Sequence, residues 1–82
     1  MTKEVENVVE DEPFHIRMYR KQELAMMYFP DVSKESACRN LRRWIQHCKD
    51  LYSRLEEKGY DKHRQFYLKR EVRLIIEYLG EP

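Results

Sequence analysis

The segment SKESACRNLRRWIQHC, residues 33–48, constrains the fold of this chain more than any other part of its sequence. When each residue advances about 100° around a helix, its apolar positions fall within an arc of about 100°. Ser33 is a good N-cap, so the pattern predicts an amphipathic helix that runs from there to about His47. The residues of the predicted core stripe are Ala37, Leu41, Trp44, Ile45 and Cys48.

A shorter helix is predicted just before it, in KQELAMMYF, residues 21–29, where Leu24, Ala25 and Tyr28 share one face. Pro30 ends this helix because proline has no amide hydrogen and excludes the helical conformation from the residue before it. The connection to the second helix is the tight turn PDVS. Two helices joined in this way, with a basic outer face on the second, are the pattern of a helix-turn-helix.

A third helix is predicted in DLYSRLEEK, residues 50–58, with Asp50 as its cap and Leu51 and Leu55 facing inward. Gly59 can adopt the left-handed conformation that ends a helix, with Tyr60 then touching Leu55 in a Schellman motif.

Strands are predicted on both sides of these helices. Residues 14–19, FHIRMY, alternate between apolar and polar side chains with the period of a half-buried strand. A second short strand is predicted at residues 65–67, where it could pair with residues 15–18.

The last predicted helix begins at Leu68, without a good cap, and stops at Gly80. Leu74 and Tyr78 point away from its main apolar stripe. They are covered by the first strand or the third helix, or they form a contact patch for a weak homodimer. The main stripe consists of Leu68, Val72, Ile75, Ile76 and Leu79.

The length of 82 residues allows one small domain, and two glycines with 38% charged residues favour a mainly α fold. No apolar run approaches the roughly 20 residues that a membrane-spanning helix needs. The first residues are acidic, which fits neither a signal peptide nor a transit peptide. We therefore expect a cytoplasmic protein.

The formal charge of +1 hides an asymmetry. Residues 1–13 contain one lysine and five carboxylates, which gives 1 − 5 = −4, and the rest of the chain carries 15 − 10 = +5. Few apolar residues lie in the acidic segment, so we predict a flexible tail at 1–13 and a basic domain at 14–82.

The cysteines and histidines predict no chemistry of their own. Cys38 and Cys48 lie about 15 Å apart if both are on one helix, which is too far for a disulfide, so we expect two partly buried thiols. A metal site that uses His47, Cys48 and His63 lacks the usual zinc-ligand spacing. No histidine, His15 included, is paired with a nucleophile at a recognisable spacing, so we expect no metal, no cofactor and no enzymatic activity.

The polar residues of the second helix fit contact with duplex DNA. Arginine can bond guanine with two hydrogen bonds and asparagine can do so with adenine, while a basic loop grips phosphates. The alternatives are a solvated basic face on a structural helix and a protein-interaction adaptor of unknown partner. The predicted groove-facing residues are Lys34, Ser36, Arg39, Asn40 and Arg43; the predicted phosphate contacts are Arg42, Lys62 and Arg64.

Several blocks of the sequence carry a family resemblance. ELA at 23–25, YFP at 28–30, LRRWI at 41–45 and the ending LGEP resemble the small bacterial domain-of-unknown-function family numbered 4248 over residues 14–82. The order of elements is also similar to that of MerR-like and excisionase-like winged helix-turn-helix proteins. That second resemblance implies a DNA-binding fold with a wing, although the helix at 50–58 is an insertion relative to it.

Overall fold

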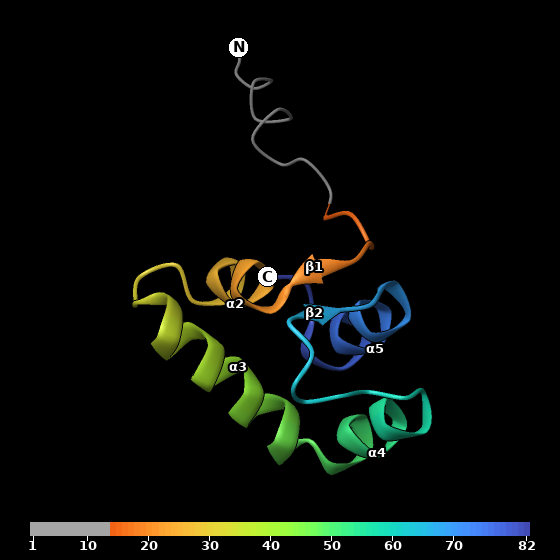
Figure 1. The fold of residues 1–82 in the computed structure, drawn as a ribbon. Coiled ribbons are helices and arrows are strands. Elements are labelled where there is room, and N and C mark those ends of the chain that lie inside the picture. Colours follow the sequence, from red (N-terminus) through yellow and green to blue (C-terminus); the bar gives the residue numbers. More distant parts are fainter. Residues whose placement is uncertain (1–13) are drawn as a thin grey trace.

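The computed structural model describes residues 14–82, which form four helices and one two-stranded sheet (Figure 1). The fold is therefore mainly α, as predicted. The predicted tail at residues 1–13 lies outside the described residues. The elements in chain order are β1 (Tyr19–Arg20), α2 (Lys21–Tyr28), α3 (Lys34–His47), α4 (Lys49–Glu57), β2 (Phe66–Tyr67) and α5 (Lys69–Leu79).

The predicted pair of helices with a tight turn between them is confirmed, with residues 29–33 as the connection. The amide hydrogen of Phe29 bonds the carbonyl of Ala25, after which Pro30 ends α2. Ser33 caps α3 through its hydroxyl, which accepts a hydrogen bond from the amide of Ser36 at 3.1 Å. This cap and the proline together fix both ends of the turn.

Trp44 is not in the core, although the sequence pattern places it there. Its exposed fraction is 45%, whereas Ala37, Leu41 and Ile45 on the same helix are buried. The indole lies at the edge of the apolar arc, where it meets the Phe29 ring edge-on with centroids 4.7 Å apart. It covers the α2–α3 turn from outside.

The predicted pairing of the first strand is wrong by several residues. Tyr19 pairs with Tyr67 and Arg20 with Phe66 in an antiparallel ladder. Phe14 and Tyr19 stack with ring centroids 5.3 Å apart, a separation that an extended strand of five residues, about 17 Å long, cannot produce. The chain bends between them, and the Tyr19 hydroxyl donates to the carbonyl of His15 at 2.7 Å. The alternation of residues 14–19 thus reflects partial burial of a bent segment.

The helix α4 ends as the sequence predicts but begins differently. Gly59 has φ 87°, and the amides of Gly59 and Tyr60 bond the carbonyls of Glu56 and Leu55, which is a Schellman motif. Cys48, not Asp50, is the N-cap residue, and its side chain makes no capping bond. The Asp50 carboxylate instead accepts a hydrogen bond from the Tyr78 hydroxyl at 2.7 Å, which connects α4 to α5.

The helix α5 has a cap that the sequence reading missed. Leu68 cannot cap with its own side chain, but the Glu71 carboxylate accepts a hydrogen bond from the Leu68 amide at 2.8 Å. Leu74 is 8% exposed and belongs to the core. The predicted second apolar stripe is therefore covered by α4, and the predicted dimer patch at Leu74 and Tyr78 is wrong for Leu74.

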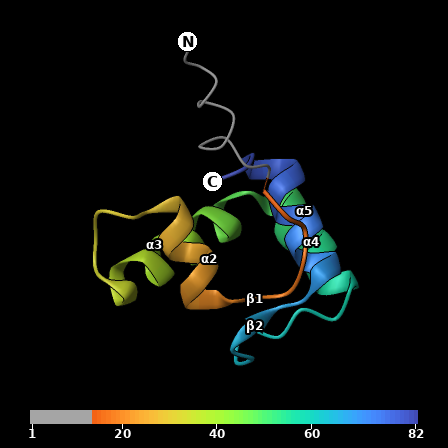
Figure 2. The same ribbon diagram turned by 90° about the horizontal axis from the view of Figure 1, so that it is seen from above.

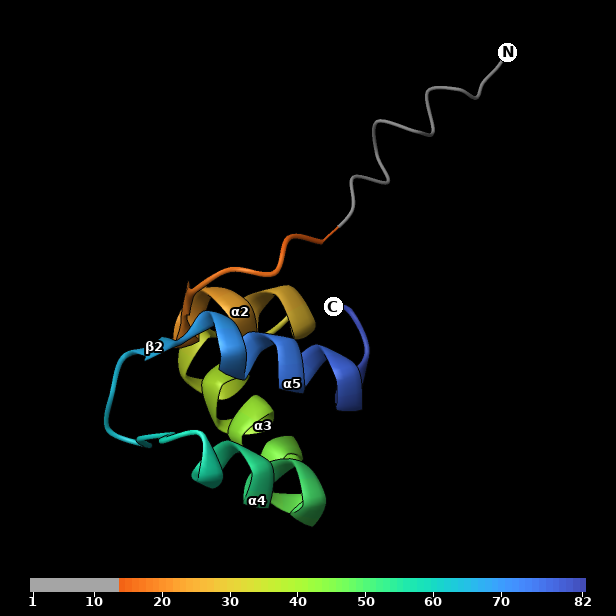
Figure 3. The ribbon, with the colours of Figure 1, turned by 90° about the vertical axis from the view of Figure 1, so that its right-hand side faces the viewer.

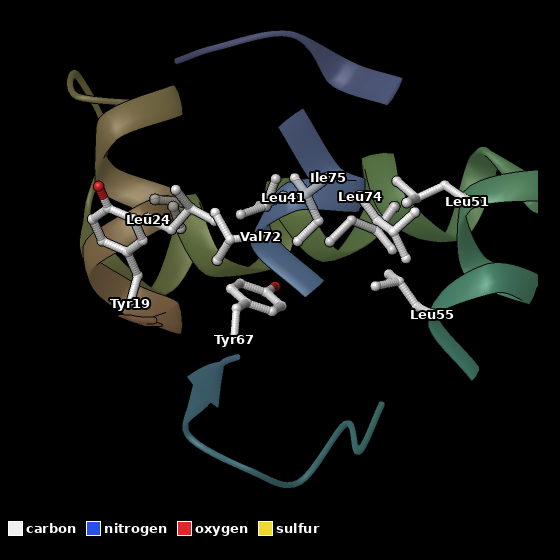
Figure 4. Packing of buried hydrophobic residues seen from close by; sticks show 12 residues of the cluster. Tyr19, Leu24, Leu41, Leu51, Leu55, Tyr67, Val72, Leu74 and Ile75 are labelled. Carbon is white, nitrogen blue, oxygen red and sulfur yellow. The ribbon is translucent and has the colours of Figure 1, made fainter. Parts of the chain in front are cut away.

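The core runs as one row through the middle of the domain (Figure 4). Tyr19 of β1 and Leu24 of α2 lie at one end, and Leu51 and Leu55 of α4 lie at the other end. Viewed from above, α2 and α3 form one side of the domain and α4 and α5 the other, with the strands joining them (Figure 2). Within residues 14–82, no helix has the length and apolar character needed to cross a membrane.

Candidate nucleic-acid interface

The outer face of α3 presents basic side chains. Arg39, Arg42 and Arg43 are exposed, as is Lys34 in the first turn. None of these four forms an ion pair with a carboxylate of residues 14–82. The ion pairs in that range are made by Arg17, Arg54 and Arg64. The helix is amphipathic enough to fix this orientation, because its buried residues hold the opposite face on the core.

Ser36 and Asn40 lie on one flank of that face and are half-buried. The Ser36 amide is used by the cap at Ser33. The structure thus brings the predicted groove-facing residues together on one helix, with the three arginines at its most accessible part.

The loop between α4 and β2, residues 58–65, stands at the end of the domain where the strands meet (Figure 3). Lys21 fixes it from α2: its ammonium donates hydrogen bonds to the carbonyls of Asp61 at 3.1 Å and Lys62 at 3.2 Å. The Asp61 carboxylate accepts a bond from the amide of His63 at 2.9 Å. The backbone that carries the exposed Lys62 side chain is therefore ordered by contacts from both sides.

Arg64 points toward the buried carboxylate of Glu71, although the sequence suggested a phosphate contact. Its guanidinium forms a two-bond ion pair with the Glu71 carboxylate, at 2.8 and 3.2 Å, and also donates to the carbonyls of Phe66 and Gly59. Glu71 is fully buried, so the arginine is required to neutralise it. The hydrogen bond to Glu71 raises the pKa of Arg64.

A pocket of about 300 Å³ lies where α2, α3 and this loop converge. Arg42 of α3 and Lys62 of the loop both line it, although they are 20 residues apart in the sequence. Lys21 forms part of the wall between them. The other residues along the wall are Arg20, Gln22, Cys38, Tyr60, Arg64, Gln65 and Tyr67.

The pocket is electropositive. Burial, followed by repulsion from Arg64, lowers the pKa of Lys21, and Arg42 adds to that repulsion. No carboxylate is among the lining residues. Burial also raises the pKa of the Cys38 thiol and of the Tyr67 phenol, so both stay protonated near neutral pH.

The two cysteines are free and half-buried, as the sequence predicts. In the part of the chain that the structure describes, no three His, Cys, Asp or Glu side chains come close enough together to hold a metal ion.

Sequence reasoning missed the contribution of Arg20 and Lys21 to this surface. Lys21 reaches residues 40 and 41 positions later in the chain, and no local pattern announces a contact of that range. The only available signal was the adjacent pair of basic residues at the start of α2.

A family model described as Domain of unknown function (DUF4248) matches residues 15–82. No curated protein and no solved structure matches the chain.

Proposed function

Since the chain belongs to the DUF4248 family, whose description assigns no activity, we propose from the geometry that this protein is a non-enzymatic, duplex DNA-binding domain. In this proposal α3 enters the major groove, and the loop at residues 58–65 holds an adjacent phosphate.

The observation that carries this proposal is the convergence of Arg42 and Lys62 on one pocket. It joins the basic face of α3 to the loop in one positive surface rather than leaving two separate patches. A continuous positive strip of this kind is the electrostatic footprint of a nucleic-acid-binding protein. Arg39 and Arg43, both exposed, extend the strip along the helix.

The proposal also uses the resemblance to winged helix-turn-helix proteins, in a modified form. Here the strands next to the loop are only two residues long and come from distant parts of the chain. The loop at 58–65 would take the place of a wing and would reach phosphates, with no β-hairpin of its own.

Binding to a random-sequence duplex across a salt series tests the proposal. Five cations on the strip would give a slope of log K against log salt of about −4.5, because each neutralised phosphate contributes about −0.9. We expect fluorescence anisotropy to show this slope. The five cations are Lys34, Arg39, Arg42, Arg43 and Lys62.

The variant Arg39→Ala/Arg43→Ala should weaken binding by at least about 100-fold, because it removes two of the five positive charges that the proposal places against the DNA. Lys69→Ala/Arg73→Ala is the matched control: it removes the same charge from exposed positions on α5, which lies on the other side of the domain from α3 (Figure 2). Equal loss in both variants, or no binding by the wild type at low salt, would contradict the assignment of α3 to the groove.

One observation favours a second candidate, a protein-interaction adaptor. Trp44 is 45% exposed beside Phe29, and tryptophan is enriched among the residues that dominate protein interfaces. If the protein is such an adaptor, Trp44→Ala should abolish capture of a protein partner. Arg39→Ala/Arg43→Ala should then leave that capture unchanged.

A further inference from the structure

The pocket between α2, α3 and the loop has a composition that DNA contact alone does not explain. Of its five cationic residues, only Arg64 is neutralised by a carboxylate, the buried Glu71. Arg20, Lys21, Arg42 and Lys62 have no ion-pair partner among residues 14–82. Asp61 is the nearest acidic residue of the loop, and its carboxylate is turned to the amide of His63.

A buried tyrosine also lines this pocket. Tyr67 is 2% exposed, and its hydroxyl makes no hydrogen bond to another residue in the range 14–82. Buried hydroxyls in native proteins nearly always have a partner, so the unpaired hydroxyl of a residue that lines a cavity is available to a ligand atom. Because the phenol stays protonated, it can donate a hydrogen bond to an anion.

We infer that this pocket is a receptor for a phosphate group, held by Arg42 and Lys62 from two sides and by the Tyr67 hydroxyl from the inside. Arginine forms two parallel hydrogen bonds with phosphate, and lysine adds a point charge. Lys21 contributes its positive charge while its hydrogen bonds hold the loop.

The size of the pocket favours a small phosphorylated molecule as the source of that group. A volume of about 300 Å³ is at the lower end of the range for small-molecule sites, which is roughly 300–1,000 Å³. A phosphate of the DNA backbone has the same chemistry and is the other source. The site does not depend on the proposed DNA binding, since its residues would hold a phosphate in either case.

Titration of the full chain with inorganic phosphate and with pyrophosphate, at constant ionic strength, tests the inference by NMR. We expect saturable shifts in the amides of residues 20–22 and 60–65 and of Cys38 and Arg42, with chloride as the reference anion. Shifts that do not saturate, or that spread over the outer face of α5, would overturn it.

The variant Arg42→Gln should lower the phosphate affinity by at least about tenfold, which corresponds to about 1.4 kcal/mol. Arg43→Gln is the matched control on the same helix, because its side chain is exposed and does not line the pocket. It should change the affinity by less than about twofold. Equal losses in the two variants would show general charge attraction and overturn the pocket.

Two more variants are included so that the test still works if one of the three variants fails to fold. Lys62→Gln lies in the exposed loop and should act like Arg42→Gln. Tyr67→Phe removes only the hydroxyl and should weaken phosphate binding by about threefold to tenfold, the range of one neutral hydrogen bond. Circular dichroism checks that each variant is folded, and an unchanged affinity in all three would refute the inference.

Cys38 gives a second readout, since it lines the pocket and Cys48 does not. Bound phosphate should slow the alkylation of Cys38 by iodoacetamide several-fold and leave the rate at Cys48 unchanged. Equal protection of both thiols would contradict a local site.

DNA distinguishes the two sources of the phosphate group. If duplex DNA neither shifts the pocket amides nor competes with pyrophosphate, the ligand is a small molecule. If duplex DNA shifts the same pocket amides and competes with pyrophosphate, the group belongs to the DNA backbone. If the wild type binds phosphate but no DNA, the phosphate site is supported and the proposed DNA-binding function is contradicted.

Discussion

At the scale of single residues, the most consequential contact is the ion pair between Arg64 and Glu71. Glu71 has no exposed surface, and its two oxygens accept bonds from Arg64 and from the Leu68 amide. One carboxylate therefore caps α5 and neutralises Arg64. The same guanidinium also donates hydrogen bonds to the carbonyls of Gly59 and Phe66. The sequence offered Arg64 as a phosphate contact, because a helix position such as that of Glu71 says nothing about a partner seven residues before it.

Glu71→Gln keeps the size of the side chain but leaves the partly buried Arg64 without its counter-charge. We expect the free energy of unfolding to fall by about 3 kcal/mol, the cost of breaking a buried pair. Urea denaturation measures this change. Glu77→Gln, an exposed change on the same helix, should stay within about 0.5 kcal/mol of the wild type. A loss of the same small size in both variants would show that the pair contributes little.

At the scale of elements, the ends of the helices determine where the candidate site lies. Ser33 and Pro30 set the turn that projects α3, and the Schellman motif at Gly59 directs the chain from α4 into the loop that carries Lys62. These ends were predictable because capping and proline rules depend on neighbours in sequence.

Gly59→Ala tests the second of these ends. The added methyl group meets only the Arg70 side chain, at 3.8 Å, so the cost comes from the backbone, which has φ 87°. We expect a loss of about 1–2 kcal/mol in the free energy of unfolding. Gly59→Asn should cost less than Gly59→Ala, since asparagine tolerates the left-handed conformation. Equal stabilities of the glycine and alanine proteins would mean that the loop start is not fixed by this residue.

At the scale of the whole molecule, one row of apolar side chains connects all four helices, and the helix pair α4–α5 closes it (Figure 4). Leu74 belongs to that row. Because α4 covers the side of α5 that the sequence left open, the Leu74 surface is part of the fold and is not available to a second copy of the chain.

Leu74→Glu should therefore unfold the domain or lower its free energy of unfolding by more than about 3 kcal/mol, because it buries an unpaired charge. Thermal denaturation and sedimentation together measure the outcome. Arg73→Glu, its exposed neighbour, controls for the added negative charge. A folded Leu74→Glu protein that differs from the wild type only in being monomeric would instead support a dimer interface at Leu74.

The sequence by itself determined the four helices, the turn between α2 and α3, and the end of α4 at Gly59. Each depends on contacts between residues at most a few positions apart, so periodicity and capping were sufficient. It also identified the three arginines on the outer face of α3, because helical spacing fixes which side of the core stripe they occupy. The second strand, near residues 65–67, was likewise visible as a short aromatic run after a polar loop.

Only the tertiary structure decided the rest. The bend that stacks Phe14 on Tyr19, the exposure of Trp44 and the burial of Leu74 depend on which element packs against which. The pocket depends on Lys21 reaching a loop 40 residues later, and the role of Arg64 depends on a buried carboxylate. Desolvation of a charge is a property of its three-dimensional surroundings, so a sequence can show that a basic residue is present but not whether it faces a ligand or an internal partner.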